Sequence, residues 1–160
     1  MEQIVQFAGR SEFQAAVRGA LAEAAAAGWR ELWLCDADFA NWPLGEPGVV
    51  ESLTQWAGPQ RRLTVLALHF DEVSRRHARW IQWRRQWAHA VHCRALQELQ
   101  PDDVPALLYA PGGLTLRLLD PLRCRGTVSR LPADGLRARE LIDAISQRST
   151  EAFPATTLGL

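Results

Sequence analysis

The sequence contains no lysine, so arginine supplies all 18 of its Lys/Arg positive charges. This absence excludes chemistry that proceeds through a lysine Schiff base. Cysteine is also scarce: Cys35, Cys93 and Cys124 are an odd number, and no two of them form a Cys-x-x-Cys pair. Each lies in or beside an apolar stretch, which indicates buried, reduced thiols.

Long apolar runs are missing as well. No run approaches the ~18 apolar residues that a membrane-spanning helix needs. The first thirty residues carry Glu2, Glu12 and Glu23 and show no compact apolar stretch after a basic start. They therefore do not resemble a signal peptide. We expect a cytoplasmic protein that makes no contact with a membrane.

Familiar catalytic and nucleotide-binding patterns are absent too. There is no P-loop, no dinucleotide-binding glycine pattern and no G-x-S-x-G turn. Ser129 and Ser146, considered as nucleophiles, have no base at a recognisable spacing. The sequence thus predicts no cofactor.

The net charge is zero, but the charges are unevenly distributed along the chain. Residues 1–60 carry three arginines and eight acidic residues, whereas residues 61–100 carry eight arginines and three acidic residues. Nucleic-acid-binding proteins usually have a basic excess or a strongly basic face. Because the basic middle can face the acidic first third, the balance argues against nucleic acid as the partner.

Predicted strands and helices alternate along the first hundred residues. We expect strands at 2–8, 30–36, 61–70 and 91–99, and helices at 11–28, 49–57 and 71–90. A hairpin around Gly112-Gly113, a strand at 123–129 and a helix at 132–149 follow. This order predicts an α/β fold with a mixed, largely parallel β-sheet and helices on both faces. One domain is expected to span residues 1–160, with a short apolar tail at about 151–160. This tail is either a disordered end or, as Phe153 and Leu158 indicate, a segment that docks onto the domain or a partner.

The segment HARWIQWRRQWAHAVHCR, residues 77–94, combines three tryptophans with four arginines and three histidines. On a helical wheel Trp80, Trp83 and Trp87 fall within about 60° of one another, and most of the arginines lie on the opposite side. Interleaved Arg and Trp can stack on single-stranded nucleic acid, but stacking requires exposed rings. The periodicity therefore favours a helix that packs its tryptophans against a sheet.

Two side chains of this segment fit the apolar stripe poorly. His77 and Arg84 point into or beside the tryptophan sector. A buried arginine needs a carboxylate, an aromatic face or a bound anion as its partner. Asp36 and Asp38 are the best carboxylate candidates because they follow a buried strand. We expect a structural ion pair there rather than an anion site.

Polar side chains also follow two of the predicted strands. Asp36 and Asp38 end one strand, and His69 and Asp71 end the next. If the strands are parallel neighbours, these groups converge where open α/β sheets bind ligands, and they could hold a divalent cation or perform acid–base chemistry. The alternative is that the aspartates are turn and helix-cap residues. Because no metal-ligand spacing is present, we predict no metal site. The candidate ligand-binding set is Asp36, Asp38, His69, Asp71, His77 and Arg84.

Three later stretches follow one another in a recognisable order. VHCRALQEL (91–99) is followed by VPALLYAPGGLTLRLL (104–119) and RGTVSRLPADGLRARELIDAISQRS (125–149), with a Gly126-Thr127 turn before the closing helix. This order resembles the phospholipase D-like fold over roughly residues 3–150. The match is to a degenerate bacterial branch that lacks the His-x-Lys-x4-Asp motif, and it implies one half of a phospholipase D-like assembly.

The resemblance implies where the catalytic motif would fall. In active members the histidine attacks phosphorus and the lysine neutralises the phosphate. Laid on the expected strand, the motif puts Asp103 at the His position, Pro105 at the Lys position and Ala110 at the Asp position. His92-Cys93-Arg94 supplies a His-x-basic pair, but Leu99 then stands at the Asp position. Neither alignment keeps all the residues that the attack on phosphorus and the neutralisation of the phosphate require.

Active members assemble two such motifs from two halves or two chains, which implies a homodimer here. We therefore expect a non-catalytic phospholipase D-like domain that acts through binding, either as a homodimer or with an unknown protein partner. Two alternatives stay open. One is an enzyme, either a phosphodiesterase or nuclease, or a metal-assisted hydrolase that uses the groups at the strand ends. The other is a nucleic-acid-binding protein that uses Arg75, Arg79 and Arg85.

Overall fold

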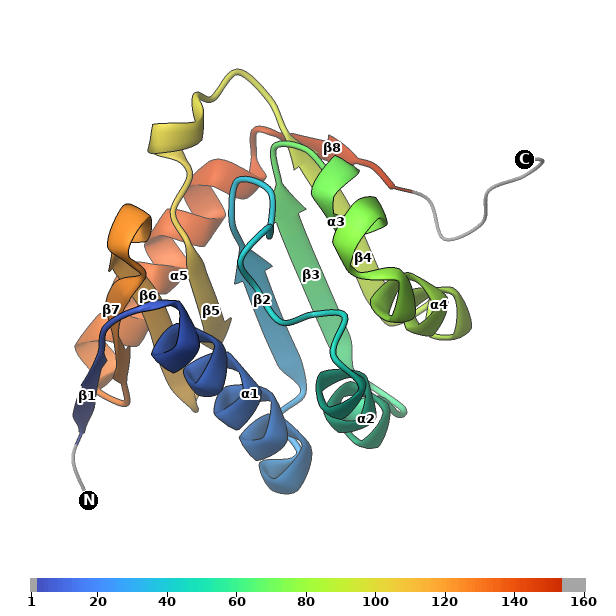
Figure 1. Ribbon diagram of the computed structural model, residues 1–160, viewed down its shortest axis with the longest axis horizontal. Coiled ribbons are helices and arrows are strands. Elements are labelled where there is room, and N and C mark those ends of the chain that lie inside the picture. Colours follow the sequence, from blue (N-terminus) through green and yellow to red (C-terminus); the bar gives the residue numbers. More distant parts are fainter. Residues whose placement is uncertain (1–2, 154–160) are drawn as a thin grey trace.

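Residues 3–153, which the computed structural model describes, form one mixed sheet with strand order β1-β7-β6-β5-β2-β3-β4-β8 (Figure 1). The strands are β1 Ile4–Phe7, β2 Glu31–Cys35, β3 Arg62–Ala67, β4 Val91–Leu96, β5 Leu107–Ala110, β6 Leu114–Asp120, β7 Arg125–Ser129 and β8 Ser149–Glu151. The helices are α1 Arg10–Ala27, α2 Pro47–Trp56, α3 Asp71–Arg76, α4 Ala78–Gln86 and α5 Pro132–Ser146, with short 3-10 turns η1 Pro101–Asp103 and η2 Pro121–Arg123. The prediction of a mixed α/β fold is confirmed.

The expectation of a largely parallel sheet is wrong. Among the described strands only the β2–β3 and β3–β4 pairings are parallel, whereas the other five are antiparallel. Helix-linked strands usually pair in parallel, and short connections give antiparallel neighbours. Here β5, β6 and β7 follow one another through short turns. Strand β1 is the edge strand at one side of the sheet, where it pairs antiparallel with β7.

Helices cover both faces of the sheet. Figure 1 shows α1 to α4 on the near face and α5 behind the sheet. Helix α1 buries Phe13, Val17 and Leu21 against the sheet and ends at Gly28, whose φ of 69° is left-handed. Glycine adopts that conformation without the steric cost that other residues incur. Among residues 3–153, no helix is long and apolar enough to cross a membrane.

The single helix predicted at residues 71–90 is two helices in the structure, because the helix breaks at His77 between α3 and α4. Trp80 and Trp83 are 1% and 3% exposed and pack in the main core, and Trp87 packs against the same core. The prediction of a core helix is therefore confirmed for these tryptophans. Rings buried in this way cannot serve as a stacking platform for bases.

The end of the described chain forms a strand that the sequence pattern did not predict. Strand β8 pairs antiparallel with β4, and Phe153 then stacks on Phe70 with ring centroids 5.2 Å apart. Most of the predicted apolar tail, Leu158 included, lies outside the described residues.

Candidate functional site

The loops that follow β2 and β3 meet the start of β5 at one edge of the sheet. Strands β2 and β3 are parallel neighbours, and β5 runs antiparallel beside β2, with Cys35 opposite Leu107. The carboxyl ends of β2 and β3 therefore lie beside the segment that precedes β5. This edge, called the strand-end edge below, is where open α/β sheets usually bind ligands.

Asp36 and Asp38 hold the turn that follows β2. Oδ2 of Asp36 accepts the backbone N–H groups of Asp38 at 3.2 Å and Phe39 at 2.8 Å. Oδ1 of Asp38 accepts the N–H of Ala40 at 2.9 Å. Burial raises the pKa of the Asp36 carboxyl, the bonds from Phe39 and Asp38 oppose the rise, and the charge of Asp38 adds to it. The turn role that the sequence left open for these two residues is the one the structure gives them.

His69 and Asp71 stand at the same edge but do not complete a ligand set. Both residues are exposed. Asp71 is the first residue of α3, where its negative charge is favourable near the helix N-terminus. Over residues 3–153, no group of three His, Cys, Asp or Glu side chains is arranged to hold a metal ion. The strand-end groups thus do not converge in the way that the metal-assisted hydrolase alternative requires.

His77 is a structural residue. Its Nδ1 accepts the backbone N–H of Gly45 at 3.1 Å, and its Nε2 lies 2.9 Å from the carbonyl oxygen of Phe39, to which it donates. This pair of bonds requires the neutral imidazole with the proton on Nε2. Burial lowers the pKa of His77, which favours the same form. The ring ties the loop after β2 to the break between α3 and α4, so neither nitrogen is left for a substrate.

The expected ion pair between Arg84 and Asp36 or Asp38 is wrong. Nε of Arg84 donates to Sγ of Cys93 at 3.0 Å, and the guanidinium lies 5.7 Å from the centre of the Phe153 ring. Helix α4 contacts the sheet over β4, whereas the two aspartates follow β2, two strands away. Strand order cannot be read from a single sequence, and the choice of carboxylate that Arg84 can reach depends on it.

The three positions to which the resemblance assigns the catalytic motif lie at the end of η1, between η1 and β5, and at the end of β5. Asp103 ends η1 and is exposed, with its carboxylate accepting the backbone N–H of Gln100 at 3.4 Å. Pro105 is half-buried, and Ala110 is the buried last residue of β5. The predicted Gly126-Thr127 turn is part of strand β7 instead.

The sequence contains another His-x-basic pair, His77-Ala78-Arg79. Arg84 stands at its Asp position, so it departs from the motif as well. The hydrogen bonds of the His77 ring also make it unsuitable as a nucleophile.

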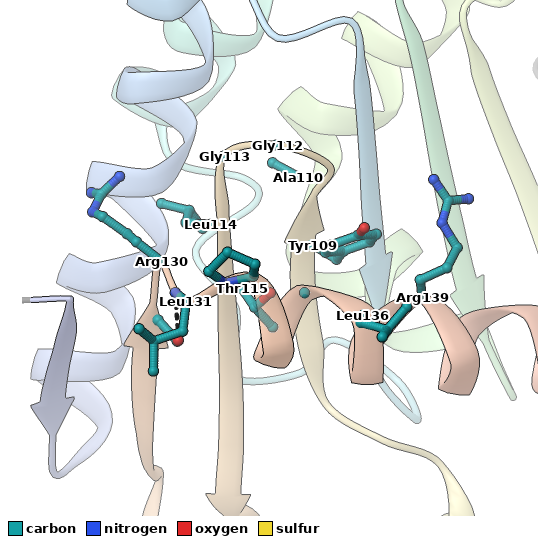
Figure 2. A pocket seen from close by; sticks show the side chains of 13 residues that line it. Tyr109, Ala110, Gly112, Gly113, Leu114, Thr115, Arg130, Leu131, Leu136 and Arg139 are labelled. Atoms are coloured by element: carbon teal, nitrogen blue, oxygen red, sulfur yellow. Dashed lines mark hydrogen bonds between the residues drawn. The ribbon is translucent and has the colours of Figure 1, made fainter.

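A separate pocket of about 420 Å³ lies at the opposite end of β5, between the β5–β6 turn and the start of α5 (Figure 2). Arg130 in this pocket forms a two-pronged ion pair with Glu23, at 2.6 and 2.7 Å. The guanidinium of Arg139 lies 5.7 Å from the centre of the Tyr109 ring. Oγ of Ser129 accepts the N–H of Leu131 at 3.2 Å. Arg130, Arg139 and Ser129 are thus engaged within the chain.

The sequence did not indicate this pocket, because a Gly112-Gly113 pair is typical of an ordinary hairpin turn. A side chain on Gly113 would collide with the ring of Trp29, at 2.6 Å from its nearest atoms. That glycine is therefore required by close packing, which a single sequence does not reveal.

Replacing Asp36 by asparagine is expected to leave the melting temperature at pH 7 unchanged or higher. The asparagine oxygen can accept the same two backbone N–H groups without a charge that burial disfavours. The pKa of Asp36 is higher in the folded state than in the unfolded state. The free energy of unfolding of the wild type therefore falls as the pH rises from the unfolded-state pKa to the folded-state pKa. The advantage of the variant over the wild type in melting temperature should therefore become smaller as the pH falls from 7 to 4.

Thermal unfolding at pH 4, 5.5 and 7 measures this effect, with the exposed Asp143→Asn change as the control. A variant that melts several degrees below the wild type at pH 7 would mean that the charge of Asp36 itself is required.

Known structures share this fold. TrmBL2, described as an archaeal chromatin protein with a novel mode of DNA binding, matches with a TM-score of 0.66 and 12% identity over 94% of this chain. The chain spans 54% of the length of TrmBL2. NucT from Helicobacter pylori matches with a TM-score of 0.64 and 6% identity, covering 93% of this chain and 98% of NucT.

Nuc from Salmonella typhimurium, a phospholipase D family member, matches with a TM-score of 0.59 and 8% identity, covering 93% of this chain and 98% of Nuc. No protein-family model matches the chain, and no curated protein matches it by sequence. The structural likenesses support a phospholipase D-like fold, as the element order predicted. At these identities they carry the fold alone.

Proposed function

We propose that this chain is a phospholipase D-like domain without phosphodiesterase activity, which acts through binding as a homodimer. The proposal rests on the residues that stand at the positions of the catalytic motif, near the strand-end edge. The reaction of active members needs an imidazole that attacks phosphorus and a lysine that neutralises the phosphate. At the corresponding positions this chain has Asp103 and Pro105, and it contains no lysine.

The four histidines do not replace the missing nucleophile. His77 is held by two hydrogen bonds to the backbone. His69 is exposed in the loop between β3 and α3. His89 precedes β4 and His92 lies near its start, whereas the strand-end edge is formed by the carboxyl ends of the parallel strands. Hydrolysis of a chromogenic phosphodiester tests this part of the proposal, and we expect none.

Two exposed leucines support the homodimer. Leu119 is 65% exposed near the end of β6, and Leu122 is 96% exposed in η2. The end of β6 lies beside the start of β5, since Arg117 is opposite Leu107, so both leucines belong to the strand-end edge. Exposed apolar side chains grouped in this way are typical of an interaction surface.

Replacing Leu122 by glutamate is expected to weaken self-association at least tenfold, because a charge would have to be buried in the interface without a partner. Sedimentation equilibrium over a range of protein concentrations measures the effect. Leu136→Glu is the matched control: Leu136 is 61% exposed but lies on α5, away from the strand-end edge. A wild type that stays monomeric at 100 µM, or equal association of the two variants, would contradict the homodimer.

A second candidate, DNA binding, is favoured by one observation. Arg79 and Arg85 are exposed on α4, and within residues 3–153 neither forms an ion pair, whereas Arg75 pairs with Glu72 at 3.1 Å. TrmBL2, which has a similar fold, is described as binding DNA. Fluorescence anisotropy with a labelled duplex at 50 and 200 mM salt tests this candidate. Binding through the two arginines would weaken with salt and would weaken further in the double alanine variant.

A further inference from the structure

Arg84 is a buried arginine without a carboxylate partner among residues 3–153. The residue is only 5% exposed, and Nε donates to Sγ of Cys93 at 3.0 Å. The thiol does not neutralise the guanidinium, because burial raises the pKa of Cys93. In the described part of the chain, the terminal nitrogens of Arg84 make no hydrogen bond. A buried guanidinium is costly unless its charge is compensated, and within residues 3–153 the Phe153 ring, 5.7 Å away, is the aromatic face beside it, so an anion could still pair with its terminal nitrogens.

A pocket of about 500 Å³ opens beside this guanidinium at the outer edge of β4. Arg84 from α4, His92 and Cys93 from β4 and Glu151 from β8 contribute to its lining. Strand β8 pairs with β4 over Arg94 to Leu96, and the N–H of Ala152 donates to the carbonyl oxygen of Cys93 at 3.0 Å, so the pocket lies at the end of this pairing. An arginine that is almost fully buried yet lines a pocket of this size can bind a ligand that enters from solvent.

Positive charge predominates around His92. Arg62, Arg84 and Arg94 all act electrostatically on its ring, and Glu151 is the one carboxylate that opposes them. None of the three arginines forms an ion pair within residues 3–153. Arg94 instead donates to Oγ of Ser149 at 2.7 Å and to its carbonyl oxygen at 2.9 Å. Arg84 lines the pocket, and Arg62 and Arg94 add positive charge near the His92 ring, so the surroundings of the pocket favour an anion.

We propose that this pocket binds a terminal phosphate group, with the Arg84 guanidinium as its principal contact and His92 as a hydrogen-bonding partner. A guanidinium presents a planar set of donors that matches two phosphate oxygens at once. A phosphate anion suits the excess of positive charge around His92, and the pocket volume of about 500 Å³ leaves room for the molecule that carries the phosphate. This inference does not depend on the proposed homodimer, since η2 follows β6 whereas Arg84 of α4 contacts β4, four positions away in the strand order of the sheet.

The test is the effect of inorganic phosphate on thermal unfolding of the full chain at pH 7, with sodium chloride at equal ionic strength as the reference. At phosphate ten times above its Kd, we expect the melting temperature of the wild type to rise by about 3 °C. Arg84→Met should abolish the rise, and Arg85→Met should retain it. The adjacent Arg85 carries the same charge but is exposed on α4, so it controls for net charge. Each variant is compared with its own phosphate-free baseline, so a change in stability alone does not alter the readout.

A second variant keeps the proposal testable if Arg84→Met does not fold. Glu151→Gln removes the one opposing carboxylate from an exposed position and should tighten phosphate binding several-fold. NMR titration of the His92 ring gives an independent signal: phosphate should raise the pKa of His92 in the wild type. The absence of a melting shift in the wild type, or an equal shift in Arg84→Met, would overturn the proposal.

The source of the phosphate is distinguished by comparing thymidine monophosphate with oligothymidylates that carry either a 5′-phosphate or a 5′-hydroxyl. Preferential binding of the 5′-phosphorylated strand would identify a nucleic-acid end, and equal binding of the monophosphate would identify a small phosphomonoester. Equal binding of the 5′-hydroxyl strand would contradict a terminal-phosphate site. A monomer that binds phosphate would contradict the homodimer and leave the phosphate site standing. A dimer that does not bind phosphate would contradict the phosphate site and leave the homodimer standing.

Discussion

Replacing Trp80 by alanine is expected to lower the free energy of unfolding by about 3–5 kcal/mol. The Trp80 side chain is among the largest fully buried ones, and its ring packs against Trp83 with centroids 6.3 Å apart. Truncation would leave a cavity between α4 and the sheet that the surrounding structure cannot fill. Urea unfolding followed by circular dichroism measures the loss.

Two further variants separate packing from other contributions of Trp80. Trp80→Phe should cost less, because it keeps a ring and removes an indole N–H that has no hydrogen-bond partner in the described structure. Gln82→Ala, an exposed change on the same helix, should alter stability by less than about 0.5 kcal/mol. If Trp80→Ala left stability intact but removed binding to single-stranded nucleic acid, the ring would be a stacking surface and the core assignment would be wrong.

Gly126→Ala is expected to lower the free energy of unfolding by about 3 kcal/mol or to prevent folding. A Cβ atom at Gly126 would overlap the backbone carbonyl oxygen of Arg117 and lie 2.8 Å from Cζ of Phe7. Because the first obstacle is backbone, relief requires the β6–β7 pairing to move next to the irregular register at Leu118 and Asp120.

Gly19→Ala is the matched control for this change. Gly19 is exposed within α1 and has no atom within 4 Å of an added Cβ, so alanine should stabilise the protein by about 0.5–1 kcal/mol. Urea unfolding of both variants gives the comparison. A Gly126→Ala protein as stable as the wild type would show that β6 and β7 can separate freely at this point.

The predictions that relied on local periodicity were confirmed. The apolar runs of β2 and β3, the amphipathic stripe of α4 and the closing helix α5 are encoded by neighbouring residues, and each was expected from the sequence. The break at His77 was not, because it depends on hydrogen bonds to Phe39 and Gly45, which are distant in sequence. Strand β8 was missed for a related reason: a three-residue strand shows no periodicity and is defined by its pairing with β4.

Sheet order limited the prediction of the site. Asp36 and Asp38 were correctly placed at the end of a buried strand, and Arg84 was correctly expected to be buried and to need a partner. The partner was wrong because the sequence does not reveal that β4 lies two strands from β2. The pocket beside Arg84 combines residues from α4, β4 and β8, so no single stretch of sequence contains a pattern that would have identified it.

The absence of phosphodiester hydrolysis is the most direct test of the proposed function. Purified protein would be incubated with bis(p-nitrophenyl) phosphate from pH 5 to 9, with and without divalent cations, beside an active phospholipase D-like nuclease as the positive control. We expect release of p-nitrophenol at the rate of buffer alone, since Asp103 and Pro105 can neither attack phosphorus nor neutralise its oxygens. Turnover that copurifies with the protein and disappears in His69→Ala or Asp36→Ala would contradict the proposal and make the strand-end edge an active site.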